Sequence, residues 1–497
     1  FGDETEALKR ALQALFGYSD HCELNLRGRR IDLKEPMVMT ELAPDLTAFV
    51  TRRLICNGQI NVVDGPAWAN KVVNAQATYS TNEATTLSNV ANIANIEVGS
   101  LITGAGVGRE VYVKAKNVGA GTLTLSQPLY GGSGTRNYRF ERFRYVFDFL
   151  GMVVCSHANF AELDITMNGA ASFLMLPPRG LCTNIRDCHI DAPKDRGITS
   201  VGRGCQGLQV DRCQFLSSEM GLSAQDRRSV AINVNANDIK VRENRVVRFG
   251  TFLIADGTGH TIVGNHWFQG DEATSGKRVP GLVLTTTNCK TVVTGNYIDN
   301  CVIEWTNEYA VAPTFAQNSL SFGGLSITGN HFFVHAVLED FSWISVKPYG
   351  GGHFIHGLTV TDNVFLVGGT KIRRVEKIDT TFADLDYSRM RKIIFQGNTF
   401  NGLLEYVANP VQITHKQGTA QSSWVVPLSQ NLPFKGWARN VDSLTATSLL
   451  TNDNGARVTE MPWVRTGQGA RKANLQVEWS KKVKGEVVIR ARMDTPN

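Results

Sequence analysis

Apolar and polar positions recur along the chain in one short pattern. In its clearest copy, Leu325–Phe332, Asn330 has an apolar residue three positions before it and another two positions after it. Aligned on that position, the pattern recurs nine times at intervals of 20 to 35 residues, at Asn168, Cys188, Cys213, Asn244, Asn265, Asn296, Asn330, Asn363 and Asn398. Agreement at two apolar positions in nine copies indicates an internal repeat.

Strand geometry explains this spacing. Side chains alternate between the faces of a strand, so the earlier apolar residue lies on the inner face of one strand and the later one on that of the next. The residue just before the aligned position is often a turn former, as in Asp187, Gly264, Gly295, Gly329, Asp362 and Gly397. Coils of this kind stack about 4.8 Å apart and bury their apolar faces together. The pattern predicts a parallel β-helix.

The aligned asparagine is predicted to point into the coil. A buried amide is costly unless it is hydrogen-bonded, and stacking lets each amide bond to the one in the next coil. Six consecutive copies, from Asn244 to Asn398, are predicted to form such a ladder. Cys188 and Cys213 take the same position in earlier coils as small apolar residues.

The repeat and the opening segment Gly2–Leu15 resemble the right-handed β-helix proteins of the pectate-lyase-like superfamily, in which a short amphipathic helix caps the first coil. Here that helix follows Asp3-Glu-Thr5, with Leu8, Leu12 and Leu15 at helical spacing. The resemblance implies an all-β, right-handed parallel β-helix. Its layout is most similar to virion spikes of phages and gene transfer agents. The superfamily contains lyases, hydrolases, epimerases and adhesins, so the fold leaves the reaction open.

Interruptions of the repeat divide the chain into four predicted segments. Residues 1–65 form the capping helix and the first coils, and residues 66–142 form a small all-β insert with Gly-rich turns. Residues 143–412 form the main β-helix. Residues 413–497 contain alternating strands without the aligned asparagine, which indicates a C-terminal β-sandwich. In tailspikes such a domain closes a trimer, so the resemblance implies a homotrimer.

Composition narrows the possible partners. A net charge of +6 gives no strong nucleic-acid footprint, and no run of 18 apolar residues predicts a membrane span. The nine cysteines include no C-x-x-C pair, which favours buried free thiols and folding in a reducing host cytoplasm, with Cys188 and Cys213 as the pair to check. The histidines lack metal-ligand spacing, so we expect neither a metal nor a cofactor.

Acidic residues follow an apolar stretch in several coils. If Ile303 and Leu338 point inward, Glu304 and Glu339 point outward from adjacent coils with their backbones about 5 Å apart, and Asp256 lies roughly 10 Å from Glu304. Glycosidases that retain configuration use carboxyl groups about 5 Å apart, and inverting ones use roughly 6.5–9.5 Å. The candidate catalytic residues are therefore Asp256, Glu304, Glu339 and Asp340, with a solvated or calcium-holding row as the alternative.

Aromatic and basic residues near these acids are candidates for contact with a sugar. Trp305, Tyr309 and Trp343 offer flat faces, and Arg373 and Arg374 offer cations to a uronate, as a polysaccharide lyase requires. Three functions follow. The chain is a virion spike that binds a cell-surface polysaccharide for host adsorption, or a depolymerase (glycoside hydrolase or lyase) of that glycan, or a non-binding connector to other virion proteins.

Overall fold

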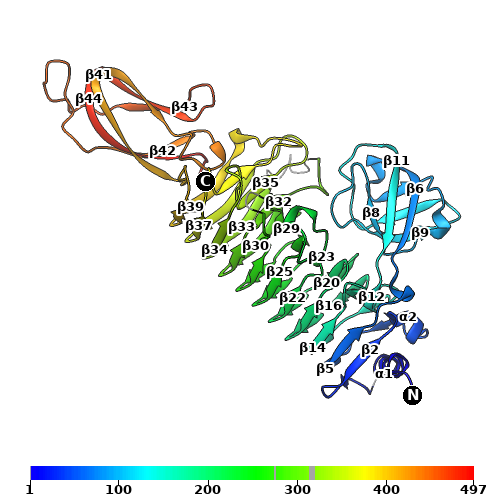
Figure 1. Cartoon of the computed structure of the whole chain (residues 1–497). Helices are drawn as coiled ribbons and strands as arrows, with labels where there is room; N and C mark the ends of the chain where they lie inside the picture. The colour runs from blue at the N-terminus through cyan, green and yellow to red at the C-terminus, as the bar shows by residue number, and fades with distance from the viewer. Residues whose placement is uncertain (1, 19, 274–275, 313–319, 497) are drawn as a thin grey trace. The chain divides into compact units, whose positions relative to one another are not determined.

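The computed structural model describes residues 2–18, 20–273, 276–312 and 320–496. They fold into two compact units, 1–312 and 313–497. Strands dominate each unit (Figure 1), which confirms the predicted all-β class. In the described ranges, no helix is both long and apolar enough to span a membrane.

Helix α1 (Glu4–Gly17) precedes the first coil of the first unit (Figure 1). A carboxylate oxygen of Asp3 accepts hydrogen bonds from the backbone N–H groups of Thr5 (2.8 Å) and Glu6 (3.2 Å) and so caps the helix. The apolar face of α1 is buried through Leu8, Leu12 and Leu15 and packs beside β1 and β2. The helix therefore covers the apolar end of the first coil, as predicted.

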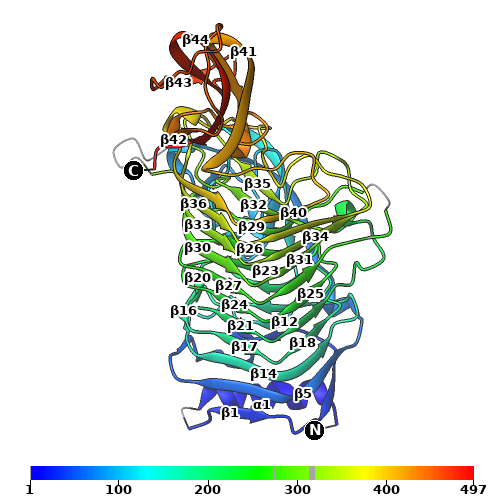
Figure 2. The ribbon, with the colours of Figure 1, turned by 90° about the vertical axis from the view of Figure 1, so that its left-hand side faces the viewer.

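Two long parallel sheets form the walls of the β-helix in the first unit. Successive strands of these sheets lie one above another (Figure 2). The first sheet contains β1 (Glu23–Asn25), β2 (Arg30–Leu33), β5 (Arg53–Val62), β14 (Ala158–Thr166), β17 (Asn184–Arg186), β18 (His189–Asp191), β21 (Gln209–Asp211), β22 (Gln214–Leu216), β24 (Lys240–Arg242), β25 (Arg245–Val247), β27 (Thr261–Val263), β28 (His266–Phe268), β30 (Asn288–Thr294) and β31 (Tyr297–Asp299).

The second sheet contains β3 (Met37–Val38), β12 (Tyr145–Asp148), β15 (Ser172–Met175), β19 (Arg196–Thr199), β23 (Val230–Asn235), β26 (Thr251–Asp256), β29 (Pro280–Leu284) and β32 (Val302–Thr306). Two short pairs complete the coils: β4 (Ala48–Phe49) with β13 (Val154–Cys155), and β16 (Arg179–Leu181) with β20 (Arg203–Gln206). A one-turn helix, α2 (Met39–Leu42), follows β3. This parallel pairing is that of a β-helix.

The repeat is in register at eight of the nine predicted positions. Within each unit, the apolar residues on both sides of the corner pair with their equivalents in the next coil, as Val241 does with Ile262 and Val246 with Trp267. The residue before each of these corners has a positive φ, between 52° and 68°, in Asp187, Arg212, Glu243, Gly264, Gly295, Gly329, Asp362 and Gly397. Glycine and aspartate tolerate this conformation best, which explains the turn formers seen in the sequence.

The first predicted copy is wrong by five residues. Asn168 is exposed, and its amide donates to the carbonyl oxygen of Val62 at 2.9 Å. Ile165 pairs with Ile190 rather than with Ile185, so buried Leu163 occupies the corner position in that coil. Glu162, just before it, has the positive φ of the other corners. A Leu in this position is invisible to an alignment based on asparagine.

The predicted asparagine ladder is present in both units. In the first unit, the Oδ1 atom of Asn265 accepts from the backbone N–H and the side-chain amide of Asn244, both at 3.0 Å, and Asn296 serves Asn265 in the same way at 2.9 and 3.0 Å. In the second unit, the Oδ1 atom of Asn363 accepts from the backbone N–H and the side-chain amide of Asn330. The Oδ1 atom of Asn398 accepts from the same two groups of Asn363. Each oxygen thus satisfies two donors of the preceding coil.

Cysteines continue this column at its N-terminal end. The backbone N–H of Cys213 donates to the Oδ1 atom of Asn244 at 2.9 Å, and the Cys213 thiol lies 3.3 Å from the carbonyl oxygen of Asp211. All nine cysteines are free thiols, and all but Cys22 and Cys182 are buried. The expectation of buried free thiols is confirmed for seven of them, and no disulfide joins Cys188 and Cys213.

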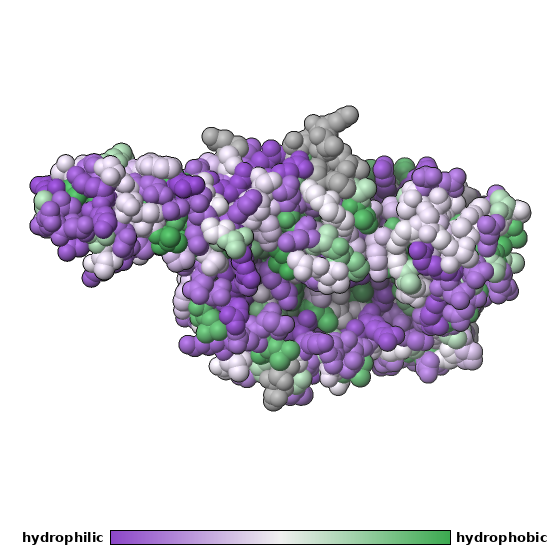
Figure 3. Space-filling view, turned by 90° about the horizontal axis from the view of Figure 1, so that it is seen from above, coloured by the Kyte–Doolittle hydropathy of each residue, from purple (hydrophilic) through white to green (hydrophobic). Residues whose placement is uncertain are grey.

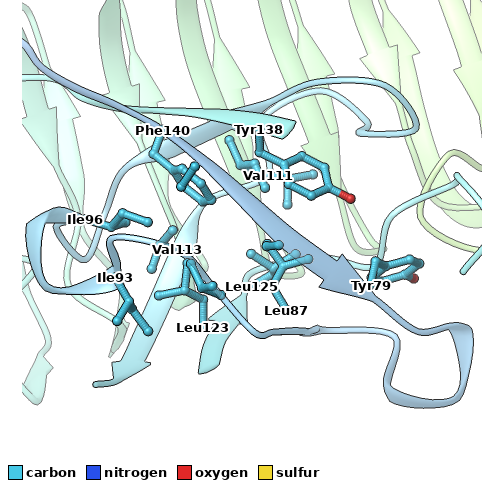
Figure 4. Close-up of a cluster of buried hydrophobic side chains, with 14 of the residues drawn as sticks. Tyr79, Leu87, Ile93, Ile96, Val111, Val113, Leu123, Leu125, Tyr138 and Phe140 are labelled. Carbon is cyan, nitrogen blue, oxygen red and sulfur yellow. The ribbon is translucent and has the colours of Figure 1, made fainter. Parts of the chain in front are cut away.

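An antiparallel sheet interrupts the first unit between β5 and β12. Its strand order is β8-β11-β6-β7-β10-β9, and it has a separate apolar core in which Leu87, Val113, Leu123 and Phe140 are buried (Figure 4). We call this sheet the insert. Its strands are β6 (Lys71–Tyr79), β7 (Thr86–Ser88), β8 (Leu101–Thr103), β9 (Val113–Asn117), β10 (Thr122–Leu125) and β11 (Gly134–Arg142).

The second unit contains further coils and a C-terminal antiparallel sheet. Its coils are built from β33 (Phe322–Thr328), β34 (His331–His335), β35 (Ile344–Lys347), β36 (Ile355–Thr361), β37 (Val364–Gly368), β38 (Glu376–Ile378), β39 (Arg391–Gln396) and β40 (Thr399–Asn401). In their core, the ring of Phe365 stacks on those of Phe332 at 4.6 Å and Phe400 at 5.7 Å. The antiparallel sheet consists of β41 (Val411–Pro427), β42 (Asn440–Ala446), β43 (Trp463–Gln468) and β44 (Asn474–Arg492).

Replacing a ladder asparagine is expected to destabilise the fold strongly. In Asn363→Ala, the backbone N–H and side-chain amide of Asn330 both lose their acceptor in a buried place, at a cost of about 3 kcal/mol. The free energy of unfolding in urea measures this. Asn401→Ala, on an exposed residue of β40, is the control and is expected to change stability by less than about 0.5 kcal/mol. Equal losses in the two variants would contradict the ladder's role.

Candidate functional site

Four of the predicted site residues belong to the first unit, and three of them, Asp256, Glu304 and Tyr309, contact the insert. The side chain of Glu304, on β32, is only 7% exposed, and one of its oxygens accepts from Arg109 of the insert at 2.6 Å. Arg109 also donates to Glu308 at 3.2 Å. Burial raises the pKa of Glu308 despite the opposing effect of Arg109. Glu304 was predicted to face solvent, but it is buried against the insert.

The insert also contacts Asp256 and Tyr309. One carboxylate oxygen of Asp256 accepts from the side chain of Gln127 at 2.7 Å, and the other accepts from the hydroxyls of Thr285 at 3.1 Å and Thr286 at 2.8 Å. The Tyr309 hydroxyl donates to the backbone oxygen of Arg109, and burial raises its pKa. These residues hold the insert in place instead of forming an open glycan-binding face.

Two of the predicted sugar-stacking residues are in the core. Trp305 is 1% exposed and donates from its indole nitrogen to the carbonyl oxygen of Thr286 at 2.9 Å. Trp343, in the second unit, is fully buried, with its ring centroid 5.3 Å from that of Phe365. The prediction that these two rings face a sugar is therefore wrong. Neighbouring large side chains bury them inside the coils.

The remaining four predicted residues meet in one place. Glu339, Asp340, Arg373 and Arg374 all line a pocket of about 490 Å³ within the second unit. The stretch around Glu339 was predicted to be a strand with Leu338 pointing inward, but it is a turn, and Leu338 is 44% exposed. The turn leaves Glu339 and Asp340 exposed at the pocket. The spacing predicted between Glu304 and Glu339 stays a prediction.

Arg373 and Glu339 form an exposed ion pair at the pocket. An Arg373 Nη2 atom donates to the Glu339 carboxylate, and the two side chains are 50% and 53% exposed. A second carboxylate, that of Glu405, lies 3.6 Å from Arg373. An exposed pair of this kind exchanges partners at little cost, so both charges remain available to a ligand.

Arg374, the next residue along the chain, points into the protein. Its guanidinium donates to Glu376 at 2.7 and 3.0 Å and to Glu405 at 2.5 Å. It also donates to the carbonyl oxygen of Leu432 at 2.7 Å, and Glu376 accepts from the backbone N–H of Phe434 at 2.7 Å. Arg374 was predicted to bind substrate. Its contacts instead give it a structural role, because they fix the 429–435 segment that bounds the pocket.

Burial disfavours the charged forms of both Glu376 and Arg374, and their mutual attraction opposes this effect. Glu376 is 1% exposed, and burial raises its pKa, while Arg374 acts in the opposite direction. The pKa of Arg374 is raised, because the attraction of Glu376 and Glu405 outweighs the effect of burial. The network is therefore a tightly coupled buried pair whose disruption leaves an uncompensated charge.

The pocket also contains residues that the sequence did not single out. They include Asp384, Tyr387 and Lys377, together with Phe434 and Lys435 from the short helix η6 (Pro433–Lys435). Burial raises the pKa of Tyr387, whose hydroxyl donates to the carbonyl oxygen of Phe434 at 3.1 Å. For Phe434 and Lys435, the signal in the sequence is the run Pro433-Phe-Lys-Gly-Trp437 just past the repeat, in which turn-forming, aromatic and basic residues are adjacent.

Within the described ranges, no group of three His, Cys, Asp or Glu side chains is arranged to hold a metal ion.

On the face shown in Figure 3, hydrophobic residues form small separate groups among hydrophilic ones. A surface of this character offers hydrogen bonds more than apolar contact. The pocket has hydroxyl, carboxylate and cationic groups beside aromatic rings, which is the combination that a sugar ring uses.

The two adjacent arginines are expected to respond differently to the same substitution. Arg374→Met leaves the buried carboxylate of Glu376 without its cation, so we expect a loss of about 3–5 kcal/mol in the free energy of unfolding. Arg373→Met breaks only an exposed pair and is expected to cost at most about 1 kcal/mol. Urea unfolding of both variants measures the difference. Similar losses in both would refute the structural assignment of Arg374.

Comparisons with known proteins give similarities in structure only. No family description matches the sequence, and no curated protein matches it. The solved tailspike protein gp49 from Pseudomonas phage LKA1 is similar with a TM-score of 0.36 and 11% identity, over 97% of this chain and 92% of that chain.

The tailspike protein of E. coli bacteriophage HK620 in complex with pentasaccharide has a TM-score of 0.37 and 10% identity, over 99% of this chain and 90% of that one. A double mutant of the same tailspike, also with pentasaccharide, has a TM-score of 0.39 at 10% identity, with the same coverage. The strand pairing given above establishes the fold independently. In fold, this chain is a parallel β-helix protein, and the solved structures named above, which are similar to it, are phage tailspikes.

Proposed function

We propose that this chain is a spike of a virus-like particle that binds a cell-surface polysaccharide through the pocket of the second unit. The observation that carries the proposal is the chemistry of that pocket. It has a volume of about 490 Å³ and combines the exposed groups of Glu339, Asp340 and Arg373 with the rings of Phe341 and Tyr387. Charged and hydroxyl groups bind sugar hydroxyls, while rings pack against the C–H faces of a sugar.

The architecture supports the same proposal. A β-helix with a capping helix, an antiparallel insert and a C-terminal antiparallel sheet resembles the layout of virion spikes. The predicted homotrimer, the attachment to other virion proteins, the surface location on the particle and folding in the host cytoplasm belong to this proposal and stay predictions. The connector hypothesis has no specific observation in its favour, whereas a pocket with exposed charges favours a binding role.

Binding is favoured over cleavage by the position of the acids. Asp256 and Glu304, two of the four candidate catalytic residues, lie against the insert and are hydrogen-bonded to Gln127 and Arg109. Glu304 is buried there, and both carboxylate oxygens of the half-buried Asp256 already accept hydrogen bonds. Glu339 forms an exposed ion pair with Arg373 that exchanges partners at little cost, so its charge is available to bind a sugar hydroxyl. These acids therefore fit anchoring roles better than roles in general acid–base catalysis.

A retention assay tests this proposal. The purified chain is incubated with labelled capsule and exopolysaccharide preparations, and bound polymer and polymer chain length are both measured. We expect retention without chain shortening. The double variant Glu339→Gln, Asp340→Asn keeps shape but removes two charges, so affinity is expected to fall about tenfold through the loss of charge-assisted hydrogen bonds.

Glu6→Gln is the matched control, because Glu6 is an exposed carboxylate paired with Arg10 on α1 and does not line the pocket. It is expected to leave retention unchanged. Equal affinity of the pocket variant and the wild type would exclude this pocket as the binding site. Chain shortening would replace the binding proposal with a depolymerase. Release of reducing ends would indicate a hydrolase, and release of an unsaturated sugar would indicate a lyase.

A further inference from the structure

The pocket adjoins a second hollow within the second unit. This hollow also measures about 490 Å³, and its lining includes Trp437 and Arg471. It shares Asp384, Tyr387 and Lys435 with the first pocket. Because both are bounded by these three residues, the two hollows adjoin, and together we call them the groove. We call the end with Trp437 the aromatic end. A groove of this length suits several consecutive sugars of a chain, whereas one pocket suits a single residue.

Aromatic rings line the aromatic end. The rings of Tyr387 and Trp437 are nearly parallel, with centroids 6.2 Å apart and an interplanar angle of 21°. The ammonium group of Lys472 lies 4.0 Å from the centre of the Trp437 ring. These rings supply apolar surface, and the lysine adds positive charge directly beside it. The combination points to a ligand that has both C–H surface and negative charge.

Two further cations at the aromatic end form no ion pair with the described residues. Among the described residues, the side chains of Lys435 and Arg471 make no ion pair or hydrogen bond, and both are exposed. The acids there are engaged within their own segment. Asp386 accepts from the backbone N–H of Ser388 at 3.0 Å, and Asp384 accepts from that of Leu385 at 2.7 Å. These hydrogen bonds leave both carboxylates charged, so the three cations Lys435, Arg471 and Lys472 exceed the two acids by one positive charge.

The backbone at one of these cations is strained, and the Arg374–Glu376 network retains it. Phe434 and Lys435 have positive φ values of 55° and 52°, although neither is glycine. Two successive residues in this conformation are strained, because the left-handed region crowds the Cβ atom against the backbone. The Phe434 N–H donates to Glu376, Arg374 donates to the Leu432 carbonyl oxygen, and these two bonds retain the segment. Strain retained by a buried ionic network is a feature of functional sites, because it fixes a side chain in advance.

We propose that the aromatic end binds an acidic sugar residue of the polysaccharide, with its anionic group held by Lys435 and Arg471 and its ring packed beside Tyr387 and Trp437. This deepens the proposed function and rests on it. The anionic group is either the carboxylate of a uronic acid or a phosphate substituent, because both are attracted by the same two cations. The neighbouring pocket then binds the next sugars through Glu339, Asp340 and Arg373.

The test uses a polysaccharide preparation that the wild-type chain retains, in three forms. One is untreated, one has its carboxyl groups reduced to alcohols, and one has its phosphates removed with cold hydrofluoric acid. We expect one of the two treatments to raise the dissociation constant about tenfold. Loss on carboxyl reduction identifies a uronate, and loss on phosphate removal identifies a phosphate.

Variants show whether Lys435 and Arg471 bind the anionic group of the polysaccharide. The double variant Lys435→Gln, Arg471→Gln is expected to bind the untreated polymer about tenfold more weakly and to be insensitive to the effective treatment, because the two changes remove the same interaction. Trp437→Leu is expected to weaken binding roughly three- to tenfold. Lys416→Gln and Trp463→Leu, on exposed residues of β41 and β43 outside the groove, are the matched controls and are expected to bind like the wild type.

The outcomes separate this inference from the proposed function. Equal retention of all three polymers by the wild type, or a double variant that still distinguishes them, overturns the acidic-sugar proposal while binding itself stands. Retention of no polymer by the wild type overturns both. Urea unfolding midpoints of the variants equal to that of the wild type show that the changes act on binding rather than on folding.

Discussion

The stacking of asparagine side chains is the interaction on which the rest of the structure depends. Each Oδ1 atom in the column accepts from the backbone N–H and the amide of the preceding coil, as Asn265 does for Asn244. A buried amide pays for its desolvation only if its donors and acceptor are all satisfied, and the column meets this condition when successive corners lie in register. The positive φ before each corner places the asparagine for this contact. Corner geometry and hydrogen bonding thus select the same register, which also aligns the apolar residues of the core.

The surface of the coils is then free to vary, and the two groups of predicted acids show how differently it is used. In the first unit, Glu304 and Asp256 bind Arg109 and Gln127 of the insert, so these acids attach one sheet to another. In the second unit, Arg374 and Glu376 hold the 429–435 segment in the same way, but Arg373 and Glu339 stay exposed. Adjacent residues in sequence therefore serve structure and binding separately.

The fold was predictable from the sequence because its determinants are local and periodic. The corner asparagines, the apolar residues beside them and the helix cap at Asp3 can all be read from a few neighbouring residues. The error at Asn168 arose where Leu163 replaces the polar residue and removes the signal. The site was less predictable, because its contacts join distant residues. Nothing in the sequence connects Arg109 to Glu304, which is 195 positions away, or Arg374 to Leu432. Burial of Trp305 and Trp343 depends on which face of a coil each occupies.

The central claim is that the asparagine column holds the coils in register. Native-state hydrogen exchange measures it most directly, residue by residue. The backbone amides of Asn244, Asn265, Asn330 and Asn363 each donate to a buried side-chain oxygen of the next coil. We predict that they exchange among the slowest amides of the chain, with protection close to that of the whole fold. Exchange at the rate of exposed turn amides would show that the column forms no lasting bonds and would contradict this account.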